Sequence, residues 1–299
     1  MPLHLPARLA RPVLAMSRRV QFRGKARLLH ALGLSLDNHD MVPPGVDRLR
    51  CVGGIEISTH DPRDVMFREL WLHGYYQDDV LVALSNLLEP GGVFWDVGAN
   101  IGLMSLWVDR QFTGAVRTVA FEPAPTVAAT LRRNLELNHA RAIEVAELCL
   151  SDRPGRVTFY PSADHSWNAT LIPSFARKYG EDLAIEVEAT TMDAYAADHG
   201  PPTVIKLDEG AEHLVIMGGQ QLLRDHDVAV VAEYNTIALA EVGLSPTQYL
   251  ELFTKLGYRP YQLRRPTWGW RRWDTLHEVH DPATLPALGN LILLKRPPR

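Results

Sequence analysis

The sequence predicts an α/β protein built on an open, largely parallel sheet. Residues 93–102, VFWDVGANIG, form an apolar run that ends in a carboxylate, turns through two glycines and opens a helix. Such a run is typical of a parallel strand covered on both faces, and glycines let the backbone approach a ligand closely. Residues 117–123, RTVAFEP, are predicted as a second strand that ends in an acid, Glu122, and residues 124–138 carry apolar side chains at helical spacing. This alternation of strand and helix indicates a nucleotide-binding βαβ unit.

Composition sets broad limits on the class of protein. The 299 residues are 46% hydrophobic, enough for a large core, and we divide them into a lead-in, 1–90, and a principal domain, 91–299. A net charge of −4 argues against nucleic acid as the main partner. The two cysteines form no metal or redox motif, so we expect no metal and a reducing, cytoplasmic setting. No apolar run approaches the ~20 residues that span a bilayer.

The glycine turn favours one class of ligand over another. A dinucleotide fingerprint reads G-x-G-x-x-G, whereas this turn reads D-x-G-x-N-x-G, with Asn100 in place of the second glycine and Leu103 in place of the third. The oxygens of Asp96 and Asn100 suit a ligand with an ammonium group better than a phosphate. S-adenosyl-L-methionine is such a ligand, and we assign Asp96, Gly98, Asn100 and Gly102 to it. A nicotinamide oxidoreductase is a distant alternative.

Two further acids follow in the order that this cofactor requires. Glu122 stands at the tip of the second strand, where an acid binds both ribose hydroxyls; the alternative is a surface acid. The helix 124–138 follows, with Asn138 as its cap, and residues 142–150 are apolar enough for a third strand. Asp152 comes next and either meets the adenine amino group or forms part of a turn.

At this point the chain resembles a known family. The segments 96–102, 121–123, 150–152 and 204–212 are similar, in this order, to motifs of the FkbM-type S-adenosylmethionine-dependent methyltransferases, and the likeness extends from about residue 22 to 233. The resemblance implies a class I methyltransferase sheet of about seven strands, Rossmann-like, with helices on both faces. It also implies methyl transfer, usually to a hydroxyl oxygen of a sugar or a natural product.

One departure from the family affects the candidate catalytic residues. The family usually reads D-V-E-G-A-E after the fourth strand, whereas residues 208–212 read DEGAE, one residue shorter. Losing one residue moves a side chain to the other face of a strand unless a bulge or turn absorbs the change. Lys206, Asp208 and Glu212 remain site candidates, with structural salt bridges as the alternative. A non-catalytic protein that binds S-adenosylmethionine is therefore the second hypothesis.

The remaining segments are predicted from periodicity and turn residues. Before the first nucleotide-binding strand we expect a basic N-terminal helix docked on the domain, or else a transit-like or membrane-surface segment. A hairpin within 48–57 and helices within 64–88 then follow. After Pro154 we expect, in order, strand 156–160, an irregular polar stretch 161–181, strand 185–190, helix 193–197, strand 204–207, helix 211–223, strand 228–232 ending at Glu233, helix 246–256 and strands 258–263 and 291–294 in a final hairpin.

Two of these segments hold candidate acceptor-site residues. His165, in the irregular stretch, is a candidate general base, although a lone loop histidine is commonly just exposed. The run 264–273 mixes arginines with tryptophans and either stacks on a substrate such as a sugar or packs on the domain. An alcohol acceptor loses its proton on methylation, and Lys206 with a lowered pKa, Asp208 and His165 are the alternatives for the base. The partner is then a small hydroxylated molecule.

Overall fold

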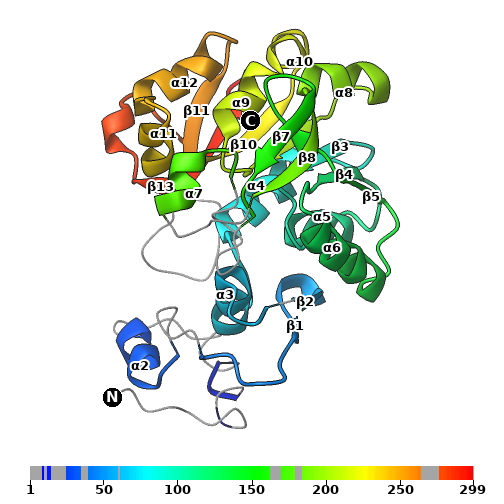
Figure 1. Cartoon of the computed structure of the whole chain (residues 1–299), viewed down its shortest axis with the longest axis vertical. Coiled ribbons are helices and arrows are strands. Elements are labelled where there is room, and N and C mark those ends of the chain that lie inside the picture. The colour runs from blue at the N-terminus through cyan, green and yellow to red at the C-terminus, as the bar shows by residue number, and fades with distance from the viewer. Residues whose placement is uncertain are drawn as a thin grey trace.

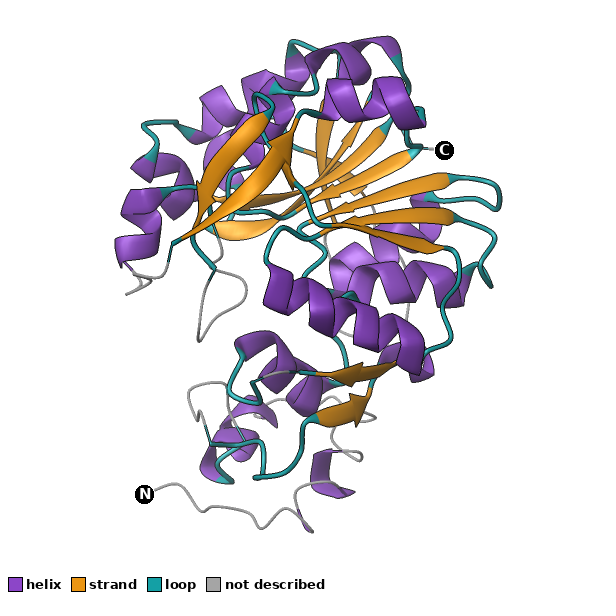
Figure 2. Ribbon diagram, turned by 45° about the vertical axis from the view of Figure 1, so that its right-hand side comes forward, coloured by secondary structure: helices purple, strands orange, loops and turns teal. Residues whose placement is uncertain are grey.

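The computed structural model describes residues 9, 12–14, 25–34, 40–59, 61–161, 170–178, 184–263 and 276–298. At its centre lies an eight-stranded sheet flanked by helices (Figure 2). The strand order is β12-β11-β13-β10-β9-β3-β4-β5. The strands are β3 (Val93–Val97), β4 (Arg117–Phe121), β5 (Ile143–Ala146), β9 (Val204–Leu207), β10 (Ala229–Asn235), β11 (Arg259–Leu263), β12 (Leu276–Glu278) and β13 (Leu288–Leu294). The predicted α/β sheet of about seven strands is confirmed, with β12 as one strand more.

The sheet is parallel where the ligand site was expected. Strands β5, β4, β3, β9 and β10 run parallel, while β13 pairs antiparallel with β10 and β11 antiparallel with β13. Strand β3 lies between β4, which follows it in sequence, and β9, which comes much later. The strand order thus reverses beside β3. Ligands of open α/β sheets bind at the carboxyl ends of the strands at such a point.

Helices cover both faces of this sheet (Figure 1). On one face Trp95 packs with side chains of α8, α9, α10 and α12, and on the other face Phe94 packs with α4 and α5. This follows from the alternation of side chains along β3. The helices are α2 (Lys25–Ala31), α3 (Val65–His73), α4 (Asp78–Leu87), α5 (Leu103–Gln111), α6 (Pro125–Leu137), α7 (Pro173–Lys178), α8 (Met192–His199), α9 (Glu212–Met217), α10 (Gln220–Asp225), α11 (Thr236–Glu241) and α12 (Pro246–Thr254).

The lead-in to the sheet packs against α6. The predicted hairpin is confirmed as β1 (Arg48–Arg50) paired antiparallel with β2 (Glu56–Ser58), and the predicted helices are α3 and α4. Ser58 donates from its backbone N–H to the Asn134 side chain at 2.8 Å, and Asn138 binds the backbone of Glu56 in the same way. These hydrogen bonds hold β2 against α6 and its C-cap residue, Asn138. Most of the basic N-terminal segment lies outside the described residues.

The prediction of a single third strand over residues 142–150 is wrong. Strand β5 ends at Ala146, and β6 (Cys149–Leu150) belongs to a separate three-stranded sheet with β7 (Gly155–Phe159) and β8 (Ile185–Thr190). Cys149 pairs with Ala189, so the chain leaves the edge of the main sheet to join strands that come later in sequence. An apolar run does not show which sheet it joins, and this is why periodicity merged the two strands.

Other predicted elements also change in the structure. The helix 211–223 is two helices, α9 and α10, separated by Gly218 and Gly219. Gly218 packs on the backbone of Ser151, where a Cβ would lie 2.0 Å from the carbonyl oxygen. The irregular stretch 161–181 contains α7, and the predicted fifth strand continues through Glu233 to Asn235. Helix α11 and strand β12 were not predicted.

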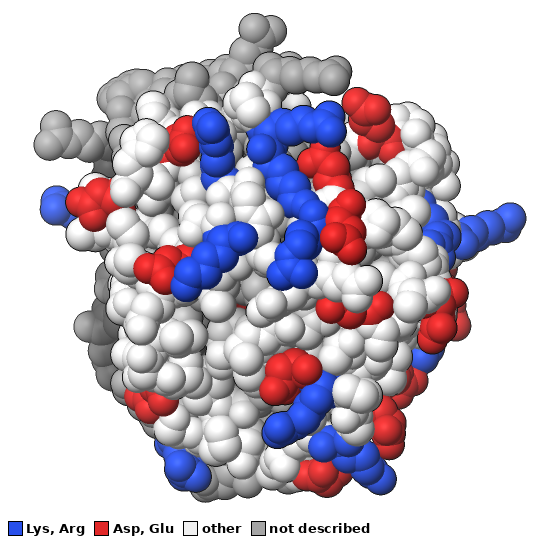
Figure 3. All heavy atoms as spheres, turned by 90° about the horizontal axis from the view of Figure 1, so that it is seen from above, with Lys and Arg blue, Asp and Glu red and all other residues white. Residues whose placement is uncertain are grey.

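Two further features of the described residues are the distribution of charge on the surface and the length of the helices. Seen from above, acidic and basic side chains are interspersed on the exposed face (Figure 3), as expected for a chain with a net charge of −4. In the part of the chain that the structure describes, no helix combines the length and apolar character needed to cross a membrane.

Candidate active site

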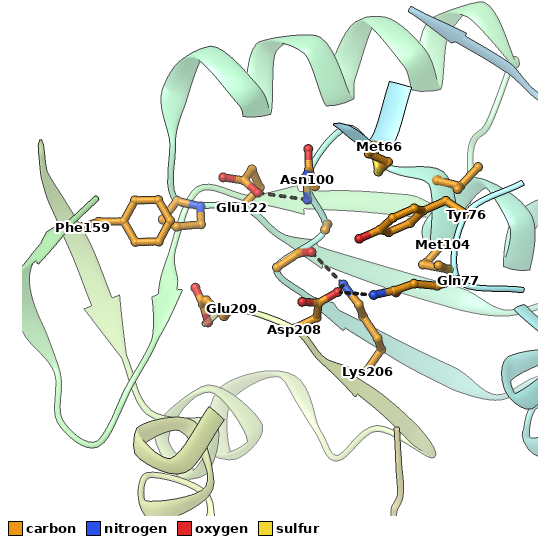
Figure 4. Close-up of a pocket in the computed structure, with 14 residues that line it drawn as sticks. Met66, Tyr76, Gln77, Asn100, Met104, Glu122, Phe159, Lys206, Asp208 and Glu209 are labelled. Carbon is orange, nitrogen blue, oxygen red and sulfur yellow. Dashed lines mark hydrogen bonds and ion pairs between the residues drawn. The ribbon is translucent and has the colours of Figure 1, made fainter. Parts of the chain in front are cut away.

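A pocket lies where β3, β4 and β9 end (Figure 4). Its walls come from segments far apart in the sequence, which the sheet topology brings to one edge. The lining residues are Met66, Tyr76 and Gln77 before α4, Gly98, Ala99, Asn100, Leu103 and Met104 after β3, Glu122 and Pro123 after β4, Phe159 on β7, and Lys206, Asp208 and Glu209 on and after β9. Of the predicted site residues, Gly98, Asn100, Glu122, Lys206 and Asp208 therefore meet in one pocket.

The glycine turn is shaped by close packing on two sides. Gly98 has φ of +73°, and a Cβ there would lie 2.0 Å from the carbonyl oxygen of Asp208. Gly102 has φ of +90°, and a Cβ there would lie 2.2 Å from Leu131 Cδ1 on α6. Gly102 does not line the pocket, so a glycine is needed at this position for the packing of the turn against α6. Asn100 also has positive φ, 51°, and within the described chain its buried Oδ1 has no hydrogen-bond partner, which leaves this acceptor for a ligand.

Glu122 is held in place by backbone donors. Its two carboxylate oxygens accept hydrogen bonds from Asn100 N and Ala124 N, both at 3.0 Å. Burial raises the pKa of Glu122 to about 7, although these hydrogen bonds oppose the shift. Each oxygen keeps a second lone pair. The side chain can therefore accept hydrogen bonds from a diol, as a ribose ligand needs.

Asp96 lies behind the pocket rather than in its wall. Its side chain is fully buried, and Oδ2 accepts from the backbone N–H and the hydroxyl of Ser105 at 3.0 and 2.6 Å. Its Oδ1 lies 3.6 Å from Lys206 Nζ. Asp96 thus holds the first turn of α5 through Ser105 and lies on one side of the Lys206 ammonium group. Its predicted contact with the cofactor stays a prediction.

Lys206 is the buried cation at the centre of the site. Its ammonium group donates to Gly98 O at 2.8 Å and lies 3.4 Å from Asp208 Oδ2. Burial alone would lower the pKa of Lys206, but the carboxylates of Asp208 and Asp96 outweigh it and raise this pKa. Lys206 therefore stays charged at neutral pH. The hypothesis that a lowered pKa makes Lys206 the base is wrong.

A turn absorbs the missing residue after β9. Strand β9 ends at Leu207, so Asp208 and Glu209 lie beyond the strand, and Gly210 follows with φ of +72°. Asp208 accepts from Gln77 Nε2 at 3.3 Å, and both acids line the pocket. Gln77 adopts a left-handed conformation, φ of 42°, which is rare for this residue type. The shortened motif thus keeps Asp208 beside Lys206.

Glu209 is a pocket residue that the sequence analysis did not select. Its side chain is 4% exposed, and neither carboxylate oxygen has a hydrogen-bond partner among the described residues. Burial raises the pKa of Glu209 well above its ordinary value, and burial likewise raises the pKa of the neighbouring Cys149 thiol. A neutral carboxyl group at this position both donates and accepts hydrogen bonds. The only sequence signal was its place in the shortened motif.

Glu212 and Glu233 lie next to the pocket. Glu212, in the first turn of α9, accepts from the backbone N–H groups of Glu209 and Gly210 at 3.0 and 2.8 Å. Glu233 projects from β10, and its carboxylate lies with those of Asp208 and Glu212 in a group whose nearest oxygens are all within 4.8 Å of one another. Burial, together with the charge of Asp208, raises the pKa of Glu212 to about 7 and that of Glu233 well above its ordinary value.

The remaining candidates do not join this pocket. Asp152 is half-buried, binds the Ser151 hydroxyl at 3.2 Å and is not among the lining residues, so its adenine contact stays a prediction. His165 and the run 264–273 lie outside the described residues.

Glu122 is expected to make the stability of the fold depend on pH. Its pKa is about 7 in the folded chain and 4.5 in the reference state, so the folded protein binds this proton more tightly. The resulting stability is complete below pH 4.5 and is lost as pH rises through 7. Since one pKa unit corresponds to about 1.4 kcal/mol, the loss is roughly 3 kcal/mol. Urea unfolding at pH 5 and pH 8 measures it, and the Glu122→Gln variant should lose correspondingly less; an equal loss in both proteins would contradict the assignment.

Comparison with known proteins gives the site a family context. A family model described as methyltransferase FkbM domain matches residues 96–260, more than half of the chain. The chain is similar to the 31-O-demethyl-FK506 methyltransferase FkbM of Streptomyces tacrolimicus, 46% identical over 78 residues, which cover 25% of this chain and 29% of that protein. It is also similar to the 2-O-methyltransferase NoeI of Sinorhizobium fredii, 32% identical over 184 residues, which cover 56% of this chain and 74% of that protein.

A solved structure with a comparable chain path is a SAM-dependent O-methyltransferase from Thermotoga maritima. It is 14% identical, the superposition covers 75% of this chain and 67% of that one, and the TM-score is 0.41.

Proposed function

The chain belongs to the methyltransferase FkbM domain family, and from this premise we propose that it transfers the methyl group of S-adenosylmethionine to a hydroxyl oxygen of a small molecule, such as a sugar or another natural product. The observation that carries the proposal is the convergence of Asn100, Glu122, Lys206 and Asp208 on one pocket where β3, β4 and β9 end. Two relatives whose names specify O-methylation support the choice of acceptor atom.

The lining of the pocket suits this cofactor. Glu122 presents two carboxylate oxygens to a ribose diol, and Asn100 presents a free amide oxygen to the ammonium group of the methionine part. Acidic residues at the pocket also favour a cofactor that carries positive charge at its ammonium and sulfonium groups. A nicotinamide dinucleotide, which carries a pyrophosphate, would meet these acids without a glycine-rich phosphate turn.

Methyl transfer to a hydroxyl group requires that the reacting atoms be held in line and that one group accept the hydroxyl proton. A methyl group on a sulfonium is already activated, so holding oxygen, carbon and sulfur in line supplies much of the rate. The attacking hydroxyl forms the new O–C bond, the C–S bond breaks, and the hydroxyl proton goes to a base. We assign this base to Asp208, because it lines the pocket and lies 3.4 Å from the Lys206 ammonium group.

The second hypothesis is a non-catalytic protein that binds S-adenosylmethionine through the same pocket. It rests on the shortened segment after β9. Because the turn at Gly210 keeps Asp208 in the pocket and 3.4 Å from Lys206, we prefer the enzyme. Turnover separates the two hypotheses, since binding is common to both.

Calorimetric titration with S-adenosylmethionine, S-adenosylhomocysteine and NAD is the first test. We expect micromolar binding of the first two and none of NAD. Release of S-adenosylhomocysteine in the presence of hydroxylated sugars and natural products then tests transfer. Binding of NAD alone would refute the cofactor assignment, whereas cofactor binding without turnover on any hydroxylated acceptor would favour the non-catalytic hypothesis.

At pH 8, above the Glu122 pKa of about 7, replacing Glu122 by alanine should weaken cofactor binding by ~1.5–3 kcal/mol, roughly 10- to 150-fold, because hydrogen bonds to a charged group have this strength. Calorimetry with S-adenosylhomocysteine measures the change. The control is Glu89→Ala, which removes an exposed glutamate from a loop and should leave affinity unchanged. Since Glu122 also binds two backbone N–H groups, the melting temperature of each variant is measured beside its affinity. Unchanged affinity in a folded Glu122→Ala variant would remove the ribose assignment.

A further inference from the structure

We propose that Asp208, Glu212 and Glu233 form a binding site for one divalent cation that prefers oxygen ligands, such as Mg²⁺, Mn²⁺ or Ca²⁺, at the edge of the cofactor pocket. The three side chains come from the end of β9, the first turn of α9 and β10. One oxygen of each lies within 4.8 Å of the others. Oxygens bound to a common cation at about 2.0–2.6 Å have separations in this range. The sequence analysis predicted no metal because these positions form no contiguous motif.

The state of Glu233 is an independent reason to expect a ligand. The residue is 8% exposed, and within the described chain its carboxylate makes no hydrogen bond and no ion pair. Burying a carboxylate without a partner is costly, so such groups normally bind a donor, an opposite charge or a metal. Since its oxygen points into the cluster with Asp208 and Glu212, the missing partner belongs there.

Two further oxygens are available beside the cluster. Glu212 uses Oε1 to bind two backbone N–H groups, which holds the side chain in place and leaves its other oxygen. Gln77 donates from Nε2 to Asp208, and its own Oε1 is buried without a partner among the described residues. Carboxylate and amide oxygens are the ligands that Mg²⁺ and Ca²⁺ take.

The charges of the cluster match a divalent cation. When ionised, the three carboxylates carry three negative charges, and Lys206 supplies one positive charge that it shares with Asp96. At least two negative charges are left without compensation. A divalent cation bound between the three carboxylates would supply the two positive charges that balance them.

The position of the cluster suggests what the cation would do, and this role rests on the proposed function. Asp208 lines the cofactor pocket, whereas Glu212 and Glu233 line a small adjacent cavity together with Gly210, Asn235 and Tyr249. A cation between the two would coordinate an acceptor hydroxyl next to the methyl donor and lower the pKa of that hydroxyl. Acceptors with two neighbouring oxygen atoms, such as vicinal diols, would chelate it and are the substrate class that this site favours.

Cation binding is tested on the full chain after treatment with a chelator. MgCl₂, CaCl₂ and MnCl₂ are titrated by calorimetry without cofactor or acceptor, and Mn²⁺ binding is followed in parallel by electron paramagnetic resonance. We expect one site per chain, at least tenfold weaker binding in Glu233→Gln and unchanged binding in Glu89→Gln, which makes the same chemical change at an exposed position. If Glu233→Gln does not fold, Asp208→Asn is measured in the same way.

The outcomes separate this inference from the proposed function. Absence of a bound cation at millimolar concentration, or equal affinity in the Glu233→Gln and Glu89→Gln variants, overturns the cation site. Titration with S-adenosylhomocysteine on the same samples reports the cofactor pocket. Cofactor binding without cation binding leaves the proposed function standing and removes the metal, whereas cation binding without cofactor binding supports the metal and removes the proposed function.

Discussion

The variant Gly98→Ala is expected to lose at least 3 kcal/mol of stability, in the range of severe substitutions, and to lose measurable cofactor binding. The new Cβ would lie 2.0 Å from the carbonyl oxygen and 2.7 Å from the carbonyl carbon of Asp208. These are backbone atoms, so no side chain can rotate away. Separating the turn from the end of β9 would also break the 2.8 Å hydrogen bond from Lys206 to Gly98 O. Urea unfolding measures the stability, and calorimetry with S-adenosylhomocysteine measures the binding.

Gly91→Ala is the matched control for this variant. Gly91 also has positive φ, +87°, but a Cβ there would meet no atom within 4 Å. Its substitution therefore costs only the left-handed conformation, about 1 kcal/mol. The difference between the two variants reports the steric contact between Gly98 and Asp208. Equal losses in both variants would mean that β9 does not approach the turn as closely as the structure places it.

The glycine turn illustrates what the sequence alone could predict. The run from Val93 to Gly102 combines a buried strand, a carboxylate and a turn within ten residues, and each is a local signal. Strand β4 with Glu122 at its tip, and strand β9 with Lys206, follow from the same kind of local pattern. All three strands were predicted close to their observed positions: β3 continues to Val97, beyond the predicted end at Asp96, and β4 ends at Phe121, just before Glu122. The pocket could therefore be placed before the structure was known.

Contacts between distant segments could not be predicted in this way. Asp96 and Lys206 are direct neighbours on β3 and β9, which depends on strand order and register rather than on either local sequence. The charge of Asp96 beside Lys206 is one reason why the pKa of that lysine is raised, opposite to the shift that burial alone would give. The acidic cluster needs Glu233 of β10 beside Glu212 of α9, and β6 needs a partner from β8. Each of these pairings joins residues that are far apart in the sequence, so no local pattern reveals it.

Replacing Lys206 by methionine should cost ~3–5 kcal/mol, because it leaves buried carboxylates without their cation. Asp96 is fully buried, the Asp208 side chain is 16% exposed, and Lys206 is the ion-pair partner of both within the described chain. Methionine keeps most of the volume of the side chain and removes the charge. The variant should also lose methyl transfer, since the Lys206 ammonium group holds both Asp208 and the Gly98 carbonyl at the pocket. Urea unfolding at pH 8 gives the stability, and release of S-adenosylhomocysteine gives the transfer.

The size of this loss distinguishes a buried ion pair from an exposed one. Lys255 forms an ion pair of 2.8 Å with Glu251 on the surface of α12, where its side chain is 73% exposed. Lys255→Met should cost ~0.5 kcal/mol or less, because water solvates both charges when the pair is broken. Similar losses in the two variants at pH 8 would mean that Lys206 does not balance buried charge, and the assignment of Asp208 as the base would lose the support of this ion pair.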